Sequence, residues 1–188
     1  MKNLTTYLCF VILLFSFTTC SDNSNNDENC DGWIWDFFNY EILISATDSE
    51  TGSNLFDPQT ENNLLGEDGV WITYKNKTFN IVDWNYPENG TRATYVRPLA
   101  LRYYPANENS SVHKKLLLGF GEFSPTSDYR NETFTIHWAD GTSDEVKLDC
   151  YITWDECAPT VHRALYLNGD EISDKDYPEL SFVKEGKK

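Results

Sequence analysis

The chain has 188 residues and a formal net charge of −15, with 40% hydrophobic and 15% aromatic residues. This excess of acidic residues disfavours nucleic acids and anionic lipid surfaces as binding partners. The length corresponds to one folded domain, and the share of aromatic residues is sufficient for a sizeable core.

The first twenty residues have the pattern of an export signal. Lys2 supplies a positive charge, an apolar run covers residues 7–17, and two threonines then precede Cys20. An apolar run of this length is too short to span a bilayer and fits the core of a signal peptide. We therefore expect residues 1–19 to be removed, and the loss of Lys2 changes the net charge from −15 to −16.

A short apolar run that ends in a cysteine resembles the signals of bacterial lipoproteins, in which that cysteine carries the lipid. Phe17 and Thr19 depart from the commonest lipoprotein pattern, and the looser pattern resembles that of Bacteroidetes lipoproteins. The resemblance implies lipidation of Cys20 and attachment to the outer membrane, with about 0.8 kcal/mol for each buried methylene of the lipid. The alternative is an ordinary secretory signal that is cleaved near a cysteine.

Residues 20–32 are predicted to form a flexible acidic tether. The run from Ser21 to Glu28 consists of Ser, Asp, Asn and Glu, which cannot bury enough apolar surface to fold. The same run resembles the export signal that sends many Bacteroidetes lipoproteins to the cell surface. The folded domain is expected to cover residues 33–183, and residues 184–188 are expected to form a charged tail.

Residues 33–183 show the alternation of apolar and polar side chains that is typical of β-strands. Alternating runs cover residues 40–47, 70–75, 79–83 and 99–103, and a more continuously apolar run covers residues 115–123. A turn at Asn76-Lys77 joins two of these runs into a hairpin. In the apolar run, Gly119 and Gly121 indicate a bulge or a close approach of two backbones.

The clearest predicted hairpin covers residues 132–152. Asp140-Gly141 lies at its turn, because glycine readily adopts the positive φ that tight turns require. A second pair of strands runs from residue 161 to residue 172 through Asn168-Gly169, and residues 180–183 are suited to an edge strand. We predict an all-β fold, namely an antiparallel β-sandwich of Ig-like or transthyretin-like type, with a small β-barrel as the alternative.

Five short segments combine strand and turn residues. They are Trp35-Asp36-Phe37, the run of Asp48 with Gly52, Asn54, Leu55, Asp57 and Pro58, Val70-Trp71-Ile72-Thr73-Tyr74-Lys75, residues 134–142 and Tyr166-Leu167-Asn168-Gly169. Together they resemble a group of small Bacteroidetes lipoproteins of uncharacterised function. The resemblance implies a β-sandwich located at the cell envelope, and it brings no catalytic residues with it.

Three cysteines remain once the signal is removed and Cys20 carries a lipid: Cys30, Cys150 and Cys157. In an oxidising compartment two of them are expected to pair. The spacing favours Cys150–Cys157, which closes a short loop and would contribute about 2–3 kcal/mol through loop entropy. The alternative joins Cys30 to Cys157 and fastens the tether to the domain.

Trp71 and Trp154 are the candidate ligand-binding side chains. Trp71 alternates out of phase with Val70, Ile72 and Tyr74, and Trp154 lies between the two paired cysteines. An exposed tryptophan on a β-sheet can stack on a sugar ring or anchor a protein contact. The alternative for each is a position in the core.

We find no motif that predicts an enzyme, a cofactor or a metal site. The histidines lack a nucleophile motif, and the spacing of Cys157 and His162 matches no common zinc site. Asp48 and Asp140 lie in turns without EF-hand spacing, which favours a turn role over calcium binding. Carboxylate pairs such as Asp140 and Asp144, or a histidine, keep a small envelope hydrolase as the alternative. The preferred function is a lipid-anchored, non-enzymatic module that binds a protein or a glycan, or has a structural role.

Overall fold

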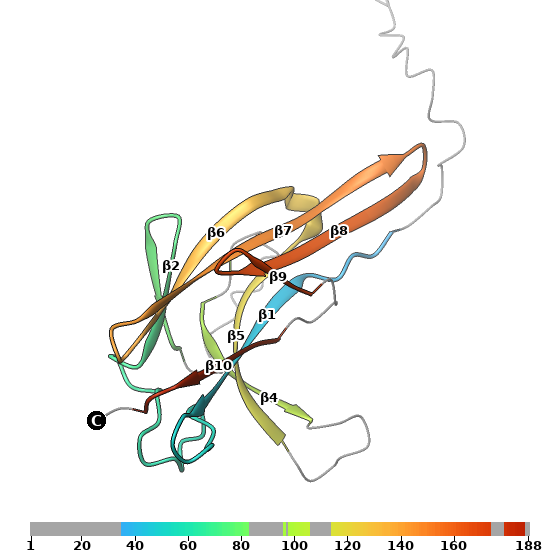
Figure 1. Ribbon diagram of the computed structural model, residues 1–188. Coiled ribbons are helices and arrows are strands. Elements are labelled where there is room, and N and C mark those ends of the chain that lie inside the picture. The colour runs from blue at the N-terminus through green and yellow to red at the C-terminus, as the bar shows by residue number, and fades with distance from the viewer. Residues whose placement is uncertain (1–34, 83–95, 97, 106–113, 174–178, 187–188) are drawn as a thin grey trace, which may run out of the picture. The chain divides into compact units, whose positions relative to one another are not determined.

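The structure is a computed structural model that describes residues 35–82, 96, 98–105, 114–173 and 179–186 (Figure 1). The predicted signal peptide, Cys20, Cys30 and the tether lie outside the described residues. Ten strands lie within the described ranges: β1 (Tyr40–Asp48), β2 (Val70–Tyr74), β3 (Lys77–Asn80), β4 (Ala100–Pro105), β5 (Lys114–Phe123), β6 (Tyr129–Trp138), β7 (Ser143–Asp155), β8 (Ala158–Leu167), β9 (Asp170–Ser173) and β10 (Glu179–Lys184). Lys184, predicted to belong to the charged tail, is therefore the last residue of a strand.

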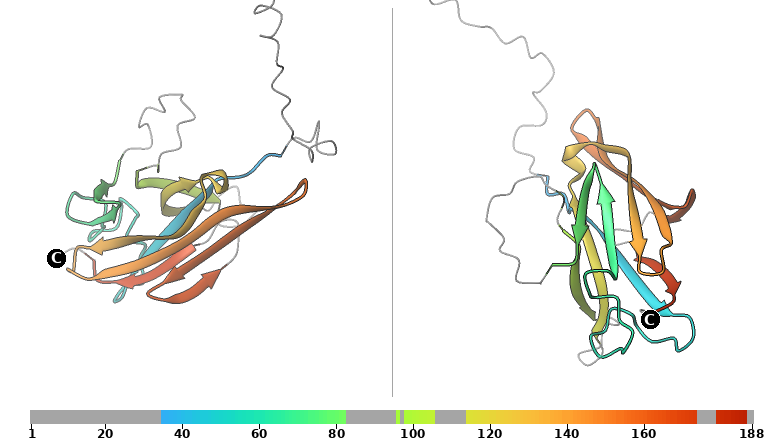
Figure 2. Two further views of the ribbon diagram at one scale, coloured as in Figure 1. Left: turned by 90° about the horizontal axis from the view of Figure 1, so that it is seen from above. Right: turned by 90° about the vertical axis from the view of Figure 1, so that its left-hand side faces the viewer.

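The strands form two β-sheets that face each other (Figure 2). One sheet has the order β10-β1-β5-β4, and the other has the order β3-β2-β6-β7-β8-β9. Ring contacts cross between them, with centroid distances of 5.0 Å from Phe120 to Phe134 and 4.8 Å from Trp138 to Phe182. The predicted all-β sandwich is confirmed, and the described strands do not close into the alternative barrel.

The strand order is that of an Ig-like sandwich. If β1 is matched to strand B of that fold, β1-β5-β4 corresponds to B-E-D and β3-β2-β6-β7 corresponds to C′-C-F-G. Two features differ. Strand β10 lies beside β1 in the place of strand A and runs parallel to it, whereas β8 and β9 extend the larger sheet beyond the place of strand G. The sandwich is therefore antiparallel apart from the β1–β10 pair.

The hydrophobic core consists of the inward-facing residues of the alternating strands. On β6 and β7 these are Phe134, Ile136, Trp138, Val146, Leu148 and Cys150, and each is at most 1% exposed. The turn between these strands lies at Asp140-Gly141, as predicted, and Gly141 has a φ of 79°. The turn between β2 and β3 lies at Lys75-Asn76, one residue earlier than predicted. Both of its residues have a positive φ, as a two-residue type I′ turn requires.

Of the two features that the sequence indicates in the apolar run, the bulge is found at Gly121. Gly121 has a φ of 81° next to a register shift in the β1–β5 pair. At Gly119, a β-carbon would collide with the carboxylate of Glu41. That carboxylate forms a largely buried ion pair with Arg102, with an N–O distance of 2.9 Å. The strand thus contains the predicted bulge, whereas Gly119 makes room for the side chains of Glu41 and Arg102 and not for a second backbone.

The predicted Cys150–Cys157 disulfide is wrong. Cys150 is a free thiol in the core, 3.4 Å from the carbonyl oxygen of Phe123, and burial raises its pKa to about 11. Strand β7 continues to Asp155, and five residues of extended strand span roughly 17 Å. A disulfide requires Cα atoms within about 7 Å, so Cys150 cannot reach the turn that contains Cys157.

Cys157 is disulfide-bonded, and its partner lies outside the described residues. Of the two pairings that the sequence favours, Cys30–Cys157 thus stays a prediction, which mapping of non-reduced peptides can test. The free thiol of Cys150 should then resist alkylation until the protein is denatured, because it is buried and its pKa is raised.

Candidate functional site

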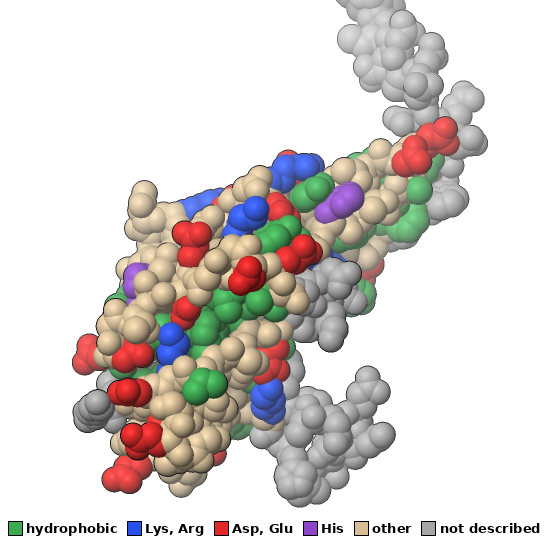
Figure 3. All heavy atoms as spheres, viewed as in Figure 1, with side chains coloured by type: hydrophobic (Ala, Val, Ile, Leu, Met, Phe, Trp, Pro, Cys, Tyr) green, Lys and Arg blue, Asp and Glu red, His purple; other side chains and the backbone are tan. Residues whose placement is uncertain are grey.

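The outer face of the six-stranded sheet carries the side chains that alternate with the core. On β7 and β8 these are Lys147, Asp149, Tyr151, His162, Ala164 and Tyr166. Figure 3 shows hydrophobic, basic, acidic and histidine side chains interspersed on the visible surface of the molecule. Such a mixture is unlike the apolar centre of a stable protein interface.

A hollow of about 480 Å³ lies over β7 and β8. Its lining consists of Asp149, Tyr151, Val161, His162, Arg163, Ala164 and Tyr166. Ala164 lies directly opposite Asp149 in the ladder. The aromatic residues lie two positions away along each strand, so the small side chain of Ala164 leaves space between them. The hollow therefore presents aromatic rings and a carboxylate together.

One side of the hollow is a stack of side chains across three strands. The rings of Tyr151 and His162 lie 4.6 Å apart with an interplanar angle of 13°. The guanidinium carbon of Arg130 lies 3.6 Å from the centre of the Tyr151 ring, and the hydroxyl of Thr153 lies 2.7 Å from Nε2 of His162. These contacts fix the rings before any ligand arrives, which lowers the entropic cost of binding.

Tyr166 forms the other side of the hollow. The Nζ atom of Lys147 lies 4.5 Å from the centre of its ring. The charge of Glu171 raises the pKa of the Tyr166 hydroxyl, with smaller contributions from burial and from Asp149. The hydroxyl therefore stays protonated at neutral pH and is able to donate a hydrogen bond to a ligand.

Trp71 lies on the same outer face, at the other end of the sheet. It is half-buried on β2, and its ring stacks on His137 with a centroid distance of 5.2 Å and an interplanar angle of 8°. The hydroxyl of Thr73 lies 2.9 Å from Nε2 of His137. Trp71 is thus outside the core, and its role in binding stays a prediction.

Trp154 does not line the hollow. It lies on β7 with 57% of its surface exposed, and its ring contacts Phe37 edge-to-face at a centroid distance of 6.4 Å. Because side chains alternate along a strand, Trp154 points away from the face that carries Tyr151. The structure therefore does not bring the two predicted tryptophans together.

Sequence reasoning missed Tyr151, His162 and Tyr166. A signal for the first of them exists, since Tyr151-Ile152-Thr153-Trp154 repeats the aromatic-Ile-Thr-aromatic pattern of Trp71-Ile72-Thr73-Tyr74. The assumed disulfide loop concealed it, because it assigned these residues to a loop instead of a strand.

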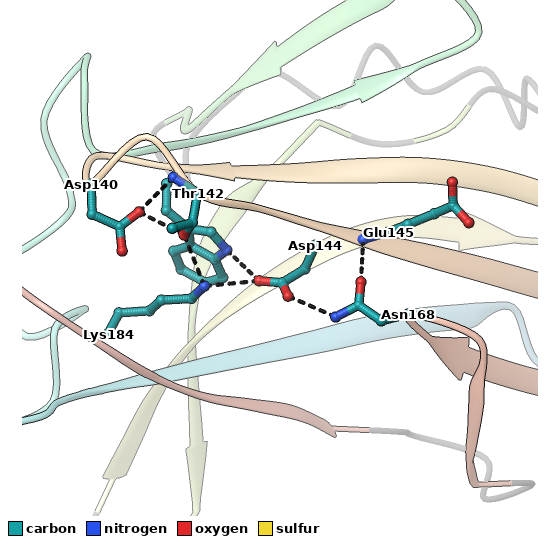
Figure 4. Close-up of polar contacts among 7 residues, drawn as sticks. Asp140, Thr142, Asp144, Glu145, Asn168 and Lys184 are labelled. Atoms are coloured by element: carbon teal, nitrogen blue, oxygen red, sulfur yellow. Dashed lines mark hydrogen bonds and ion pairs between the residues drawn. The ribbon is translucent and has the colours of Figure 1, made fainter.

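Asp144 is used to hold the two sheets together. Its carboxylate accepts hydrogen bonds from the indole of Trp138 at 2.7 Å, the amide of Asn168 at 2.8 Å and the ammonium group of Lys184 at 2.9 Å. Figure 4 shows the carboxylate between Asn168 and Lys184. Burial alone would raise the pKa of Asp144, but these donors lower it overall. The group is therefore ionised at neutral pH, unlike the protonated acid that glycoside hydrolysis requires.

The acidic turns have the structural role that the sequence favours. One oxygen of Asp140 accepts hydrogen bonds from the backbone N–H and the hydroxyl of Thr142, at 2.8 and 2.6 Å. Asp48 does the same with Thr51, at 2.7 and 2.9 Å. Within the described ranges, no group of three or more His, Cys, Asp and Glu side chains is placed to hold a metal ion.

Comparison of the chain with known protein families, with curated proteins and with solved structures finds no match in any of the three. In the part of the chain that the structure describes, no helix is both long and apolar enough to cross a membrane. The geometry of the hollow is therefore the basis for assigning a function.

Proposed function

We propose that this chain is a lipid-anchored protein of the cell envelope that binds a carbohydrate without changing it chemically. The observation that carries the binding role is the hollow, where Tyr151, His162 and Tyr166 surround Ala164 beside Asp149. Sugar rings present apolar C–H faces together with hydroxyl groups. Arg130 on β6 and His162 on β8 cover the ring of Tyr151 from both sides, so a sugar is expected to meet its edge and its hydroxyl. The carboxylate of Asp149 and the hydroxyl of Tyr166 supply further partners for the sugar hydroxyls.

The charge of the chain favours a neutral carbohydrate. A net charge of −15 repels anionic ligands. A protein partner is less well supported, because the centre of a protein interface is depleted of charged residues. Here Asp149 lies two residues from Tyr151 along β7, and Lys147 lies directly opposite Tyr166.

The residues around the hollow support binding over catalysis. Its described lining contains one carboxylate, Asp149, and no serine or cysteine. Hydrolysis of a glycoside normally needs two carboxyl groups, and acyl transfer needs a nucleophile.

The lipid anchor is proposed from the signal pattern that ends at Cys20. A Cys20→Ala variant is expected to incorporate no labelled palmitate and to move from the membrane fraction to the soluble fraction. The measurement is metabolic labelling followed by fractionation. Undiminished labelling of the variant would overturn the anchor and leave the binding proposal in place.

The binding role is tested with the full-length protein in detergent. It is screened against oligosaccharides of cellulose, laminarin, amylose, mannan and xylan. We expect at least one series to bind, and Tyr151→Ala to weaken that binding by about tenfold or more, as for a central aromatic contact.

Phe38→Ala is the matched control, because Phe38 is an aromatic residue that is 69% exposed and lies outside the hollow. Its binding should equal that of the wild type, and thermal melting should show that all variants are folded. Binding that survives Tyr151→Ala, or binding of none of the five series, would overturn the proposal.

A further inference from the structure

The outer face of the six-stranded sheet contains the same three-residue arrangement twice. In each, an aromatic ring lies directly opposite a histidine in the ladder and stacks on it: Trp71 on His137 and Tyr151 on His162. In each, a threonine two residues after the aromatic residue is hydrogen-bonded to Nε2 of that histidine. Only the second arrangement borders the hollow described above.

The ladder registers place the two arrangements far apart on one face. His137 pairs with Ser143 at the start of β7, and Tyr151 lies eight residues further along the same strand. At about 3.4 Å per residue this corresponds to roughly 27 Å, which is much longer than one sugar ring. Because eight is an even number, both arrangements project from the same side of the sheet.

The surface between the two arrangements is polar. Its outward side chains on β6 and β7 include Thr133, Thr135, Glu145, Lys147 and Asp149, and Tyr166 on β8 lies opposite Lys147. Hydroxyl, carboxylate and ammonium groups suit the hydroxyls of a sugar chain, whereas the apolar centre that a protein interface needs is lacking.

We infer that this face binds an extended, neutral oligosaccharide chain, with a second aromatic subsite at Trp71, His137 and Thr73. The inference rests on the proposed carbohydrate binding and deepens it by naming the ligand class. A chain laid along β7 would contact both ring stacks, with the polar side chains between them. Two linked contacts bind more tightly than either does alone.

The test measures affinity against chain length by titration calorimetry. The full-length protein is titrated with the disaccharide and the hexasaccharide of the series that binds. In the wild type we expect the hexasaccharide to bind at least about tenfold more tightly than the disaccharide. Trp71→Ala should abolish this gain, whereas Tyr151→Ala should weaken the binding of both lengths.

A second variant and a control keep the inference falsifiable. If Trp71→Ala fails to fold, His137→Ala removes the stacking partner and should reduce the same gain, whereas Phe38→Ala should retain it. Equal affinity for both lengths in the wild type, or a full gain in the Trp71 and His137 variants, would overturn the second subsite alone. Absence of binding at every length would overturn the proposed function as well.

Discussion

A Phe120→Ala variant is expected to have a free energy of unfolding about 3–5 kcal/mol below that of the wild type. Phe120 lies on β5 with no exposed surface, and its ring lies 5.0–6.5 Å from the rings of Tyr74, Phe79, Phe123 and Phe134. These rings come from both sheets. Truncation would leave a cavity that paired strands cannot close. Urea denaturation followed by tryptophan fluorescence measures the loss.

Two variants serve as controls for Phe120. Phe120→Leu keeps much of the buried volume and should lose clearly less stability than Phe120→Ala. Phe38→Ala removes a ring that is 69% exposed and should change the free energy of unfolding by no more than about 0.5 kcal/mol. A loss below about 1 kcal/mol for Phe120→Ala would contradict the central position of this ring.

The alternation of side chains predicts much of the fold, because it records which side of each strand is buried. It identifies the hairpin of β6 and β7 with its turn at Asp140-Gly141, and it places Trp71 on the outer face. It also predicts an edge strand at residues 180–183. It does not reveal that β10 pairs with β1 in parallel, because a local pattern specifies a strand and its faces but not a partner far away in the chain.

The hollow could not be predicted from the sequence for a similar reason. It depends on the register that sets Tyr151 opposite His162 and Ala164 opposite Asp149. A shift of one residue would turn one side of each pair to the other face. The assumption of a disulfide loop at Cys150 and Cys157 also ended β7 too early, whereas the strand continues to Asp155. The sequence alone therefore could not predict the register of β7 and β8.

A second large loss of stability is expected when Asp144, which links the two sheets through Lys184, is replaced. Asp144→Ala should lower the free energy of unfolding by about 2–4 kcal/mol at pH 7. The substitution leaves the ammonium group of Lys184 without its ion-pair partner and the indole N–H of Trp138 without its acceptor. Both side chains of the ion pair are only 14% exposed, and the indole is that of the buried Trp138. Urea denaturation of both proteins measures the difference.

The same difference in stability should depend on pH. The pKa of Asp144 is lowered from its ordinary value of 3.8, because hydrogen bonds from Asn168, Lys184 and Trp138 outweigh the effect of burial. Its ionised form therefore stabilises the folded state above pH 3.8, and this contribution is lost as the pH falls through the lowered pKa. The gap between wild type and Asp144→Ala should narrow on going from pH 7 to pH 3. An equal gap at both values would mean that the charge of Asp144 contributes nothing, and that the loss arises from packing alone.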